Sequence, residues 1–231
     1  MANRTLVKVN KLSIGHESRT LCSGISFEIR EGECIMLCGA NGSGKTTLMK
    51  TLAAGHDSSA SIQFVEGCEC IMIPARIPKV SGFTLKEFVR ISCFSKSDLH
   101  GKLSPNEEAI MEEAIRNLNL EHLADRDIST LSDGEFQKAG IASALVRKAS
   151  VILLDEPTAF LDAQNRISVL NTLKEICRRG HRPAVVFSTH DLHDGLQVCS
   201  KVFAIGVDKT LYISKEDTSE AKSDTISKIF R

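Results

Sequence analysis

The sequence predicts an α/β fold built around a parallel sheet, with a helical block inserted into it. Apolar runs such as Val151–Leu154 and Ala184–Ser188 are typical of strands buried on both faces. Segments with helical periodicity alternate with these runs, and such alternation favours parallel strands joined by helices. Residues 80–147 are instead helical in pattern, so we expect a block inserted between elements of the sheet.

The first part of the chain is expected to consist mostly of strands. Residues 5–9, 25–29 and 33–38 show apolar alternation or continuous apolar runs. A helix is expected from about Lys45, and residues 60–73 are expected to hold two further short strands.

One helix of the inserted block carries clear start signals. Ser104 is expected to cap it, with Pro105 at its first position and Glu107 closing a capping box. Apolar side chains then recur on one helical face, at Ile110, Met111, Ala114, Ile115 and Leu118.

The remaining elements return to the α/β pattern. A helix is expected between the two buried strands and should stop before Gly180. Its apolar positions are Ile167, Leu170, Leu173 and Cys177. A strand pair near residues 201–214 and a short charged helix are expected to end the chain.

Composition excludes several classes of protein. The 231 residues suit one large domain, and their 29 basic and 29 acidic side chains cancel. With one tyrosine and no tryptophan we expect no nucleic-acid partner. No apolar run approaches a membrane span and the first ten residues lack a signal peptide's apolar core, so we expect a soluble intracellular protein. None of the eight cysteines forms a CxxC pair, which favours buried or incidental thiols.

A glycine-rich stretch, CGANGSGKTT, follows a predicted strand and opens a predicted helix. Its spacing matches a phosphate-binding loop at Gly39, Gly44, Lys45 and Thr46. Backbone N–H groups and the helix N-terminus attract phosphate oxygens. Lys45 would neutralise the β- and γ-phosphates and Thr46 would bind Mg²⁺. The alternative is a turn with a solvated lysine.

Two further strand ends carry polar groups. Asp155 and Glu156 follow a buried strand, where Asp155 could hold Mg²⁺ and Glu156 could take a proton from water; alternatively they are capping acids. His190 follows the next strand and could contact the γ-phosphate, although a lone histidine is often structural. Ligands bind at the carboxyl ends of parallel strands, so we expect all three residues to meet the glycine-rich loop.

The stretch LSDGE at Leu131–Glu135 has a simple structural explanation. Ser132 caps a helix and Glu135, three residues later, closes a capping box. A capped helix N-terminus also attracts anions, so a binding role is compatible with this explanation.

In their order and spacing, GANGSGKTT, LSDGE, ILLDEPTAFLD and STH resemble the motifs of ABC-type ATPases over nearly the whole chain. The resemblance implies a P-loop NTPase core spanning residues 1–231, with an antiparallel β subdomain and a helical subdomain at 80–147. It implies ATP and Mg²⁺ as ligands, with Lys45, Glu156 and His190 catalytic and Thr46 and Asp155 on the metal. The implied ATP contacts are Gly39, Ala40, Asn41, Gly42, Ser43, Gly44, Lys45, Thr46, Thr47 and His16.

In this family two subunits pair head to tail around two ATP molecules, and we expect a second copy of the chain as the partner. The implied contacts to the partner's ATP are Ser132, Asp133, Gly134 and Glu135. The implied dimer interface is Ala159, Phe160, Leu161 and Asp162.

Several positions depart from the family pattern. Ala75 stands where a glutamine is usual, and alanine can neither bind a metal nor orient water. His16 takes the place of the aromatic that stacks on adenine, unless it is a simple loop residue. Asp133 and Glu135 replace the usual glycine and glutamine, and their charge is unfavourable beside a triphosphate unless it is directed away.

A single cassette without membrane spans resembles the separate ATPase subunit of a transporter, and the helical block is most similar to importers of metal chelates. That resemblance implies integral membrane permease subunits, an indirect substrate-binding protein, and a peripheral place on the cytoplasmic face of the membrane. Phe83, Phe88 and Val89 are expected to line the groove for the permease.

The main alternative is a soluble ABC ATPase that serves as a scaffold, for example in iron–sulfur cluster assembly. It would share every nucleotide motif and differ only in its partner. The cysteines lack the spacing of cluster ligands and do not favour it.

Overall fold

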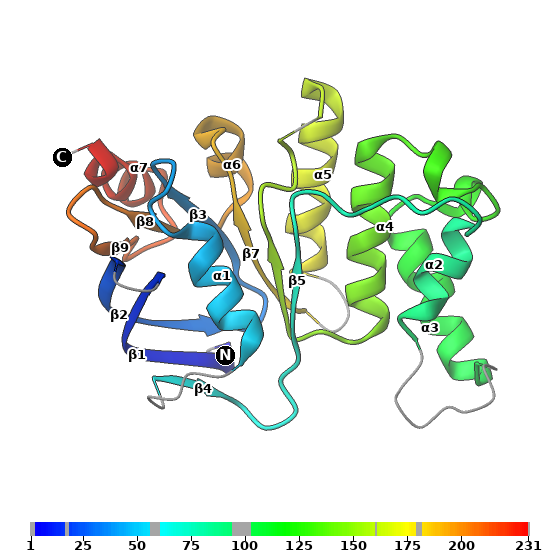
Figure 1. Cartoon of the computed structure of the whole chain (residues 1–231), viewed down its shortest axis with the longest axis horizontal. Coiled ribbons are helices and arrows are strands. Elements are labelled where there is room, and N and C mark those ends of the chain that lie inside the picture. The colour runs from blue at the N-terminus through cyan, green and yellow to red at the C-terminus, as the bar shows by residue number, and fades with distance from the viewer. Residues whose placement is uncertain are drawn as a thin grey trace. The chain divides into compact units, whose positions relative to one another are not determined.

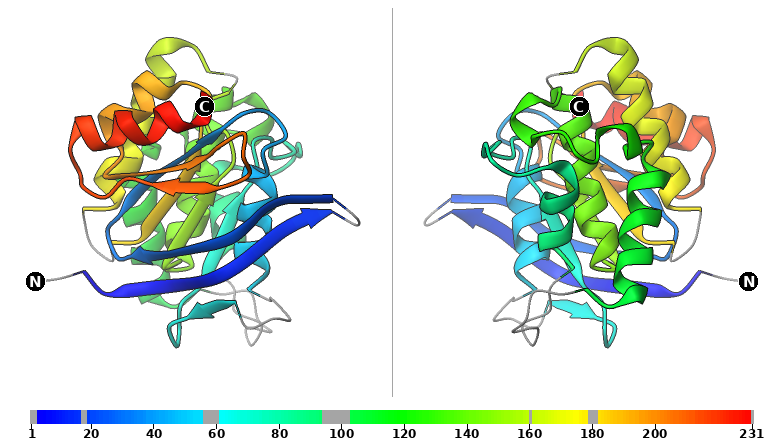
Figure 2. Two further views of the ribbon diagram at one scale, coloured as in Figure 1. Left: turned by 90° about the vertical axis from the view of Figure 1, so that its left-hand side faces the viewer. Right: turned by 90° about the vertical axis from the view of Figure 1, so that its right-hand side faces the viewer.

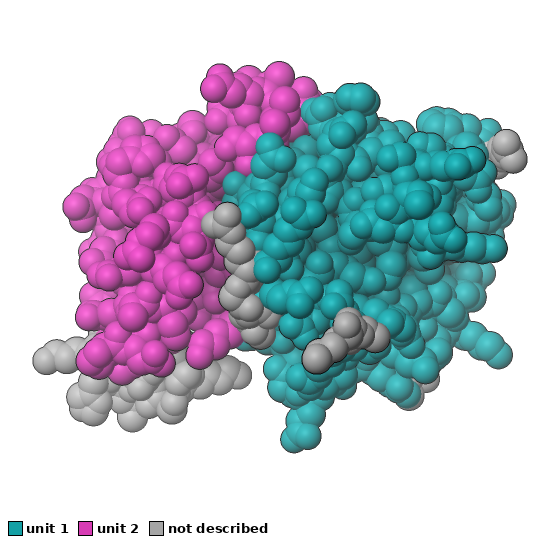
Figure 3. Space-filling view, turned by 180° about the vertical axis from the view of Figure 1, so that it is seen from behind, with its two compact units in different colours: residues 1–75, 150–159, 170–231 teal, residues 76–149, 160–169 magenta. Residues whose placement is uncertain are grey.

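The computed structural model describes residues 3–16, 19–55, 61–93, 103–159, 161–178 and 182–230. They form two compact units (Figure 3). The first unit comprises Met1–Ala75, Ser150–Ala159 and Leu170–Arg231, and the second comprises Arg76–Ala149 and Phe160–Val169. The 80–147 boundaries of the predicted helical subdomain stay a prediction.

The first unit contains a six-stranded sheet in the order β5-β6-β7-β3-β8-β9 (Figure 1). Neighbours from β5 to β8 are parallel and β9 is antiparallel to β8. The predicted parallel sheet and terminal strand pair are therefore confirmed. The strands are β3 (Cys34–Gly39), β5 (Cys70–Ile73), β6 (Val151–Leu154), β7 (Ala184–Ser188), β8 (Lys201–Ile205) and β9 (Leu211–Ile213).

A smaller antiparallel sheet in the same unit has the order β2-β1-β4. Its strands β1 (Thr5–His16) and β2 (Arg19–Arg30) are longer than the runs that predicted them, and Figure 2 shows them as a long two-stranded ribbon. The third strand is β4 (Ile62–Phe64). With β5, it accounts for the two short strands predicted within 60–73.

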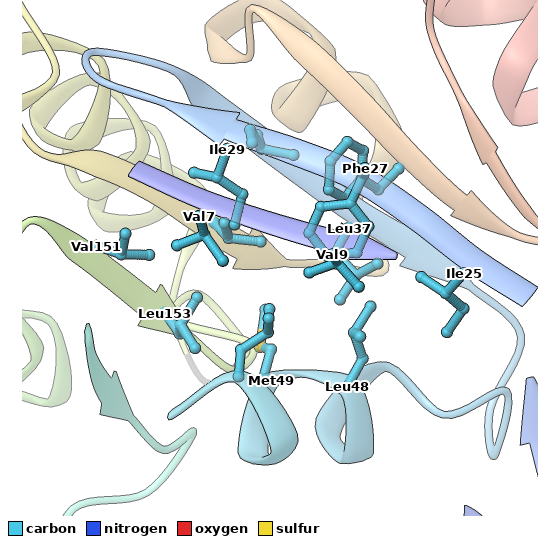
Figure 4. Close-up of a cluster of buried hydrophobic side chains, with 14 of the residues drawn as sticks. Val7, Val9, Ile25, Phe27, Ile29, Leu37, Leu48, Met49, Val151 and Leu153 are labelled. Atoms are coloured by element: carbon cyan, nitrogen blue, oxygen red, sulfur yellow. The ribbon is translucent and has the colours of Figure 1, made fainter. Parts of the chain in front are cut away.

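In the core of the first unit, the helix after the glycine-rich loop packs against both sheets. This helix, α1 (Lys45–Ala54), turns Leu48 and Met49 toward Val7, Val9 and other side chains of the sheets (Figure 4). The rings of Phe27 and Phe203 lie 4.8 Å apart and join the small sheet to β8. Burying each such side chain contributes about 1.5–3 kcal/mol, so the start of α1 is held in place by its packing.

The other helices of this region are α5 (Ala163–Ile176), α6 (Leu192–Val198) and α7 (Ser219–Ser227), followed by a 3₁₀ turn η3 (Lys228–Phe230). Helix α5 crosses the division between the units. Its predicted apolar positions Leu170, Leu173 and Cys177 are buried, whereas Ile167 is 50% exposed because it precedes the packed half of the helix.

The second unit is helical, with α2 (Leu85–Ile91), α3 (Pro105–Asn117), α4 (Asp133–Val146) and two 3₁₀ turns, η1 (Glu121–Leu123) and η2 (Ile128–Thr130). Helices α2 and α3 both pack on α4. The capping box of Ser104 and Glu107 and the proline at the start of α3 are confirmed. Met111, Ala114, Ile115 and Leu118 are buried as their spacing predicts, and Ile110 is half-buried.

All eight cysteines are free thiols, and five of them are buried. No helix in the described ranges is long and apolar enough to cross a lipid bilayer.

Replacing Ser104 with alanine removes the cap of α3. The Ser104 Oγ accepts the Glu107 N–H at 3.3 Å, so its loss leaves a helix-end donor without that partner. We expect the free energy of unfolding to fall by about 1 kcal/mol. Urea denaturation followed by circular dichroism measures this change. Glu113→Gln, on the exposed face of the same helix, is the matched control; equal effects of the two variants would contradict the capping role.

Candidate functional site

The glycine-rich loop between β3 and α1 leaves a helix N-terminus open. Gly44 precedes α1 with φ 109, and the helix has no side-chain cap, so its first N–H groups remain available to a ligand. A Cβ at Gly44 would lie 3.1 Å from Ile14 Cδ1 and 3.3 Å from Leu21 Cβ. Both the backbone conformation and the crowding therefore require glycine here.

Lys45 folds back into this loop. Its side chain is buried, and Nζ donates to the carbonyl oxygens of Gly39 at 2.9 Å and Ala40 at 3.1 Å. Burial lowers the pKa of Lys45, while the carboxylates of Glu156 and Asp155 oppose that shift. The ammonium group is thus held at the loop beside two acidic residues.

Asp155 lies at the end of β6 and is held from two sides. Its Oδ2 accepts a 2.8 Å hydrogen bond from Thr46 Oγ1. Its Oδ1 accepts one of 2.8 Å from the Ser188 hydroxyl, and the same hydroxyl accepts the Glu156 N–H at 2.7 Å. Ser188, the fully buried last residue of β7, therefore joins two strand ends to the glycine-rich loop.

Sequence reasoning missed Ser188. A serine at the end of a buried strand is common, so this position gave little indication of a functional role. Only the side-by-side pairing of β6 and β7 shows that its hydroxyl faces the acidic pair.

Glu156 faces His190, with Oε1 and Nε2 2.7 Å apart. An ionised carboxylate only accepts, so Nε2 carries the proton in this contact. Their side chains are 31% and 50% exposed, which leaves both accessible to water. Glu156 also has a φ of 46, an unusual backbone conformation for a non-glycine residue that often marks functional sites.

These residues fit a nucleotide with Mg²⁺. Ser43 Oγ is buried without a protein partner among the described residues, beside a loop that suits phosphate. The oxygens of Thr46 and Asp155 are of the kind that Mg²⁺ binds. No group of three or more histidine, cysteine or acidic residues in the described ranges could form a metal cage.

Most predicted site residues of the first unit come together. The loop residues Gly39 to Thr47 adjoin Asp155, and Glu156 contacts His190. His16 is the last residue of β1, and its side chain lies outside the described residues, so the adenine contact stays a prediction. Phe160 also lies outside the described residues.

The predicted capping box at LSDGE is confirmed at the start of α4. Glu135 Oε2 accepts from the Ser132 N–H at 2.7 Å and the Ser132 hydroxyl at 2.8 Å. Partial burial raises the pKa of the Glu135 carboxyl, but these hydrogen bonds outweigh it and the net shift is downward. The carboxylate is directed onto Ser132, so the added charge at this position is internally satisfied.

Three other predicted residues, Leu161, Asp162 and Asp133, have defined contacts within the second unit. A Cβ on Gly134 would lie 3.5 Å from Leu161 Cδ2, so Leu161 packs there. Asp162 caps the start of α5 by accepting from the N–H and side-chain amide of Asn165, at 2.8 and 2.9 Å. Asp133 forms an ion pair with Lys79.

The expected permease groove needs one correction. Val89 is completely buried within the second unit, so it cannot line a surface groove. The capping box of Thr84 and Glu87 fixes the start of α2, and Leu85 and Val89 form the buried face of that helix. Phe88 packs on Phe136 of α4 with ring centroids 5.2 Å apart, whereas Phe83 is 41% exposed.

Comparisons with known proteins agree with this geometry. Residues 22–159 match the ABC transporter family. The achromobactin transport ATP-binding protein CbrD of Dickeya dadantii is 28% identical over 87% of this chain and 79% of its own. The aliphatic sulfonates import ATP-binding protein SsuB of Granulibacter bethesdensis is 33% identical over 89% of this chain and 82% of its own.

Solved structures show the same fold. A transporter assigned to the metal-chelate ABC type, in an inward-facing conformation, superposes with a TM-score of 0.84 at 24% identity. The superposition covers 98% of this chain and 89% of that chain. With the match of more than half of its residues to the family, the chain belongs to the ABC transporter family, as an ATP-binding cassette with ATPase activity.

Proposed function

We propose that the chain hydrolyses ATP at the loop of Lys45 and thereby drives a membrane transporter that imports a metal chelate. The observation that carries the hydrolytic site is the Ser188 hydroxyl. It connects Asp155, already bonded to Thr46, with the backbone of Glu156. One hydrogen-bonded unit thus joins the groups proposed for phosphate, metal and water.

When phosphate binds, the ammonium group of Lys45 changes its hydrogen-bond partners. The ammonium group leaves the carbonyls of Gly39 and Ala40 for the β- and γ-phosphate oxygens, and the open N–H groups of the loop surround them. Thr46 and Asp155 would hold Mg²⁺, which neutralises charge on the phosphates when bound.

Glu156 is proposed as the group that accepts the proton of the attacking water. His190 donates to its carboxylate and so fixes the direction of the accepting oxygens. When the γ-phosphate is present, the imidazole N–H would exchange its contact with Glu156 for one with a phosphate oxygen, which is the second part of the proposed role of His190.

The start of α4 is proposed to complete the site of a second copy of the chain. The Ser132 hydroxyl and the backbone of Gly134 lie at a helix N-terminus, where an anion is stabilised. Asp133 and Glu135 flank these groups, and Ala159, Phe160, Leu161 and Asp162 are proposed to cross the same interface. The helical subdomain at 80–147 would carry this surface to the partner.

The cargo and the membrane partners rest on the comparisons. An achromobactin transport relative and a fold neighbour of the metal-chelate type support a metal chelate as cargo. The chain would bind integral membrane permease subunits on the cytoplasmic face, and through them act with a substrate-binding protein. The sulfonate import relative makes an organosulfonate the alternative cargo.

Replacing Glu156 with glutamine should separate ATP binding from hydrolysis. The amide cannot accept the proton of the attacking water, so we expect turnover to fall about a thousandfold while ATP stays bound. Phosphate release and nucleotide retention measure the two effects. Turnover at the wild-type rate would refute the proposed role of Glu156.

Replacing Ser188 with alanine should slow hydrolysis without abolishing ATP binding. The change removes the donor to Asp155 and leaves the buried Glu156 N–H unpaired, so we expect kcat to fall about tenfold. Ser214→Ala is the matched control, because Ser214 is also buried and its hydroxyl accepts a backbone N–H in β8. A similar loss in both variants would show a general packing effect instead.

Replacing Phe83 with glutamate should weaken binding to the membrane partner. Phe83 is the exposed member of the three residues predicted for the groove, so a charge there disturbs the surface more than the interior. We expect co-purification with a polytopic membrane protein from detergent-solubilised cells to be lost, while ATP binding persists. Val207→Glu, at an apolar residue 64% exposed in the first unit, is the control. Recovery of soluble proteins only, by the unchanged chain, would favour the scaffold alternative.

A further inference from the structure

Lys79 contacts three groups at the start of α4. Its Nζ donates to Asp133 Oδ1 at 2.7 Å and to the Leu131 carbonyl at 2.7 Å. The same nitrogen lies 5.8 Å from the centre of the Phe136 ring. Lys79 belongs to the stretch between Ala75 and α2, so it ties this stretch to the two residues that bracket Ser132, within the second unit.

The two partners of this ion pair differ in exposure. The Lys79 side chain is 26% exposed and that of Asp133 is 63% exposed. A pair this open adds little to folding stability, because solvent screens it. Without Lys79, however, the Asp133 carboxylate at the helix end would be unpaired and would repel an incoming anion.

The negative charge of Glu135 is compensated by different contacts. Its carboxylate accepts two hydrogen bonds from Ser132 and is directed along the capping box. Asp133 accepts no hydrogen bond from the first turn of α4 in the described structure, and Lys79 is its ion-pair partner. The two acidic residues of LSDGE are therefore compensated by different groups.

We propose that Lys79 is a positioning residue that neutralises Asp133, and so allows the start of α4 to accept the triphosphate held by a second copy of the chain. This inference rests on the proposed ATP-bridged dimer and adds a determinant outside the five residues of LSDGE. It also explains how an aspartate occupies a helix end that must receive an anion.

The test uses the full chain carrying Glu156→Gln, which should hold ATP without turnover. Sedimentation velocity with Mg²⁺ and increasing ATP measures dimer formation, and ATP binding by the monomer is measured separately. Lys79→Gln keeps a donor for the Leu131 carbonyl but removes the charge. We expect it to raise the dimer dissociation constant about tenfold, the scale of one unit charge acting near a solvated surface. Lys79→Arg should restore dimer formation, and Lys86→Gln, at an exposed lysine of α2, is the matched control.

Asp133 provides a second arm, in which the single variant Asp133→Asn does not depend on the folding of the Lys79 variants. If neutralisation is the role of Lys79, Asp133→Asn should tighten the dimer, and the double variant Lys79→Gln/Asp133→Asn should dimerise better than Lys79→Gln alone. The difference between Lys79→Gln and its parent should also shrink as salt is raised.

Three results would overturn the inference, and they differ in what they imply for the proposed function. If Asp133→Asn weakens the dimer as much as Lys79→Gln does, the ion pair is only a structural tether and the inference is overturned. A parent dimer that Lys79→Gln leaves unchanged overturns it as well, but leaves the proposed function intact. Absence of any ATP-dependent dimer in the parent chain overturns the proposed function and this inference together.

Discussion

The arrangement of the candidate site depends on one buried hydroxyl. Ser188 donates to Asp155 and accepts from the Glu156 N–H, and all three residues lie at the carboxyl ends of the adjacent strands β6 and β7. Asp155 in turn accepts from Thr46 in the first turn of α1. Because strand pairing sets the place of Ser188, the sheet itself holds the acidic pair at the glycine-rich loop. The packing of Leu48 and Met49 holds α1 from the other side.

A second constraint acts at the start of α4, where the chain carries two acidic side chains at a proposed anion site. The Glu135 carboxylate accepts hydrogen bonds from Ser132 in the capping box, and Asp133 is paired with Lys79. A helix N-terminus stabilises acidic residues in the absence of a ligand, and the same residues oppose an incoming phosphate. In the absence of an anion the two acidic residues would stabilise this helix end, and in the proposed ATP-bridged dimer they would oppose the phosphates. Under our proposal Lys79, which lies outside both the helix and LSDGE, compensates the charge of Asp133.

The sequence predicted what local pattern or spacing determines. The capping boxes of Ser104 and Ser132, the parallel sheet and the contiguous loop around Lys45 all follow from short-range signals. Ser188 and Lys79 escaped prediction because their partners lie 33 and 54 residues away, and the sequence alone does not show which distant side chains face each other. Val89 was predicted at the surface because its apolar neighbours suggested a groove, but helical spacing places it on the same buried face as Leu85.

The glycine-rich loop holds Lys45 through two of its own backbone carbonyls. The buried ammonium group of Lys45 donates to the carbonyls of Gly39 and Ala40, so at the proposed site phosphate would displace these bonds rather than meet an unpaired charge. The exchange is favourable because phosphate oxygens carry full charge and the loop's N–H groups add to the attraction. If a ligand without phosphate charge displaced these bonds, Lys45 would lose two carbonyl acceptors and gain little in return. Under our proposal, the two hydrogen bonds of Lys45 would therefore favour a ligand that carries phosphate charge, in addition to the shape of the loop.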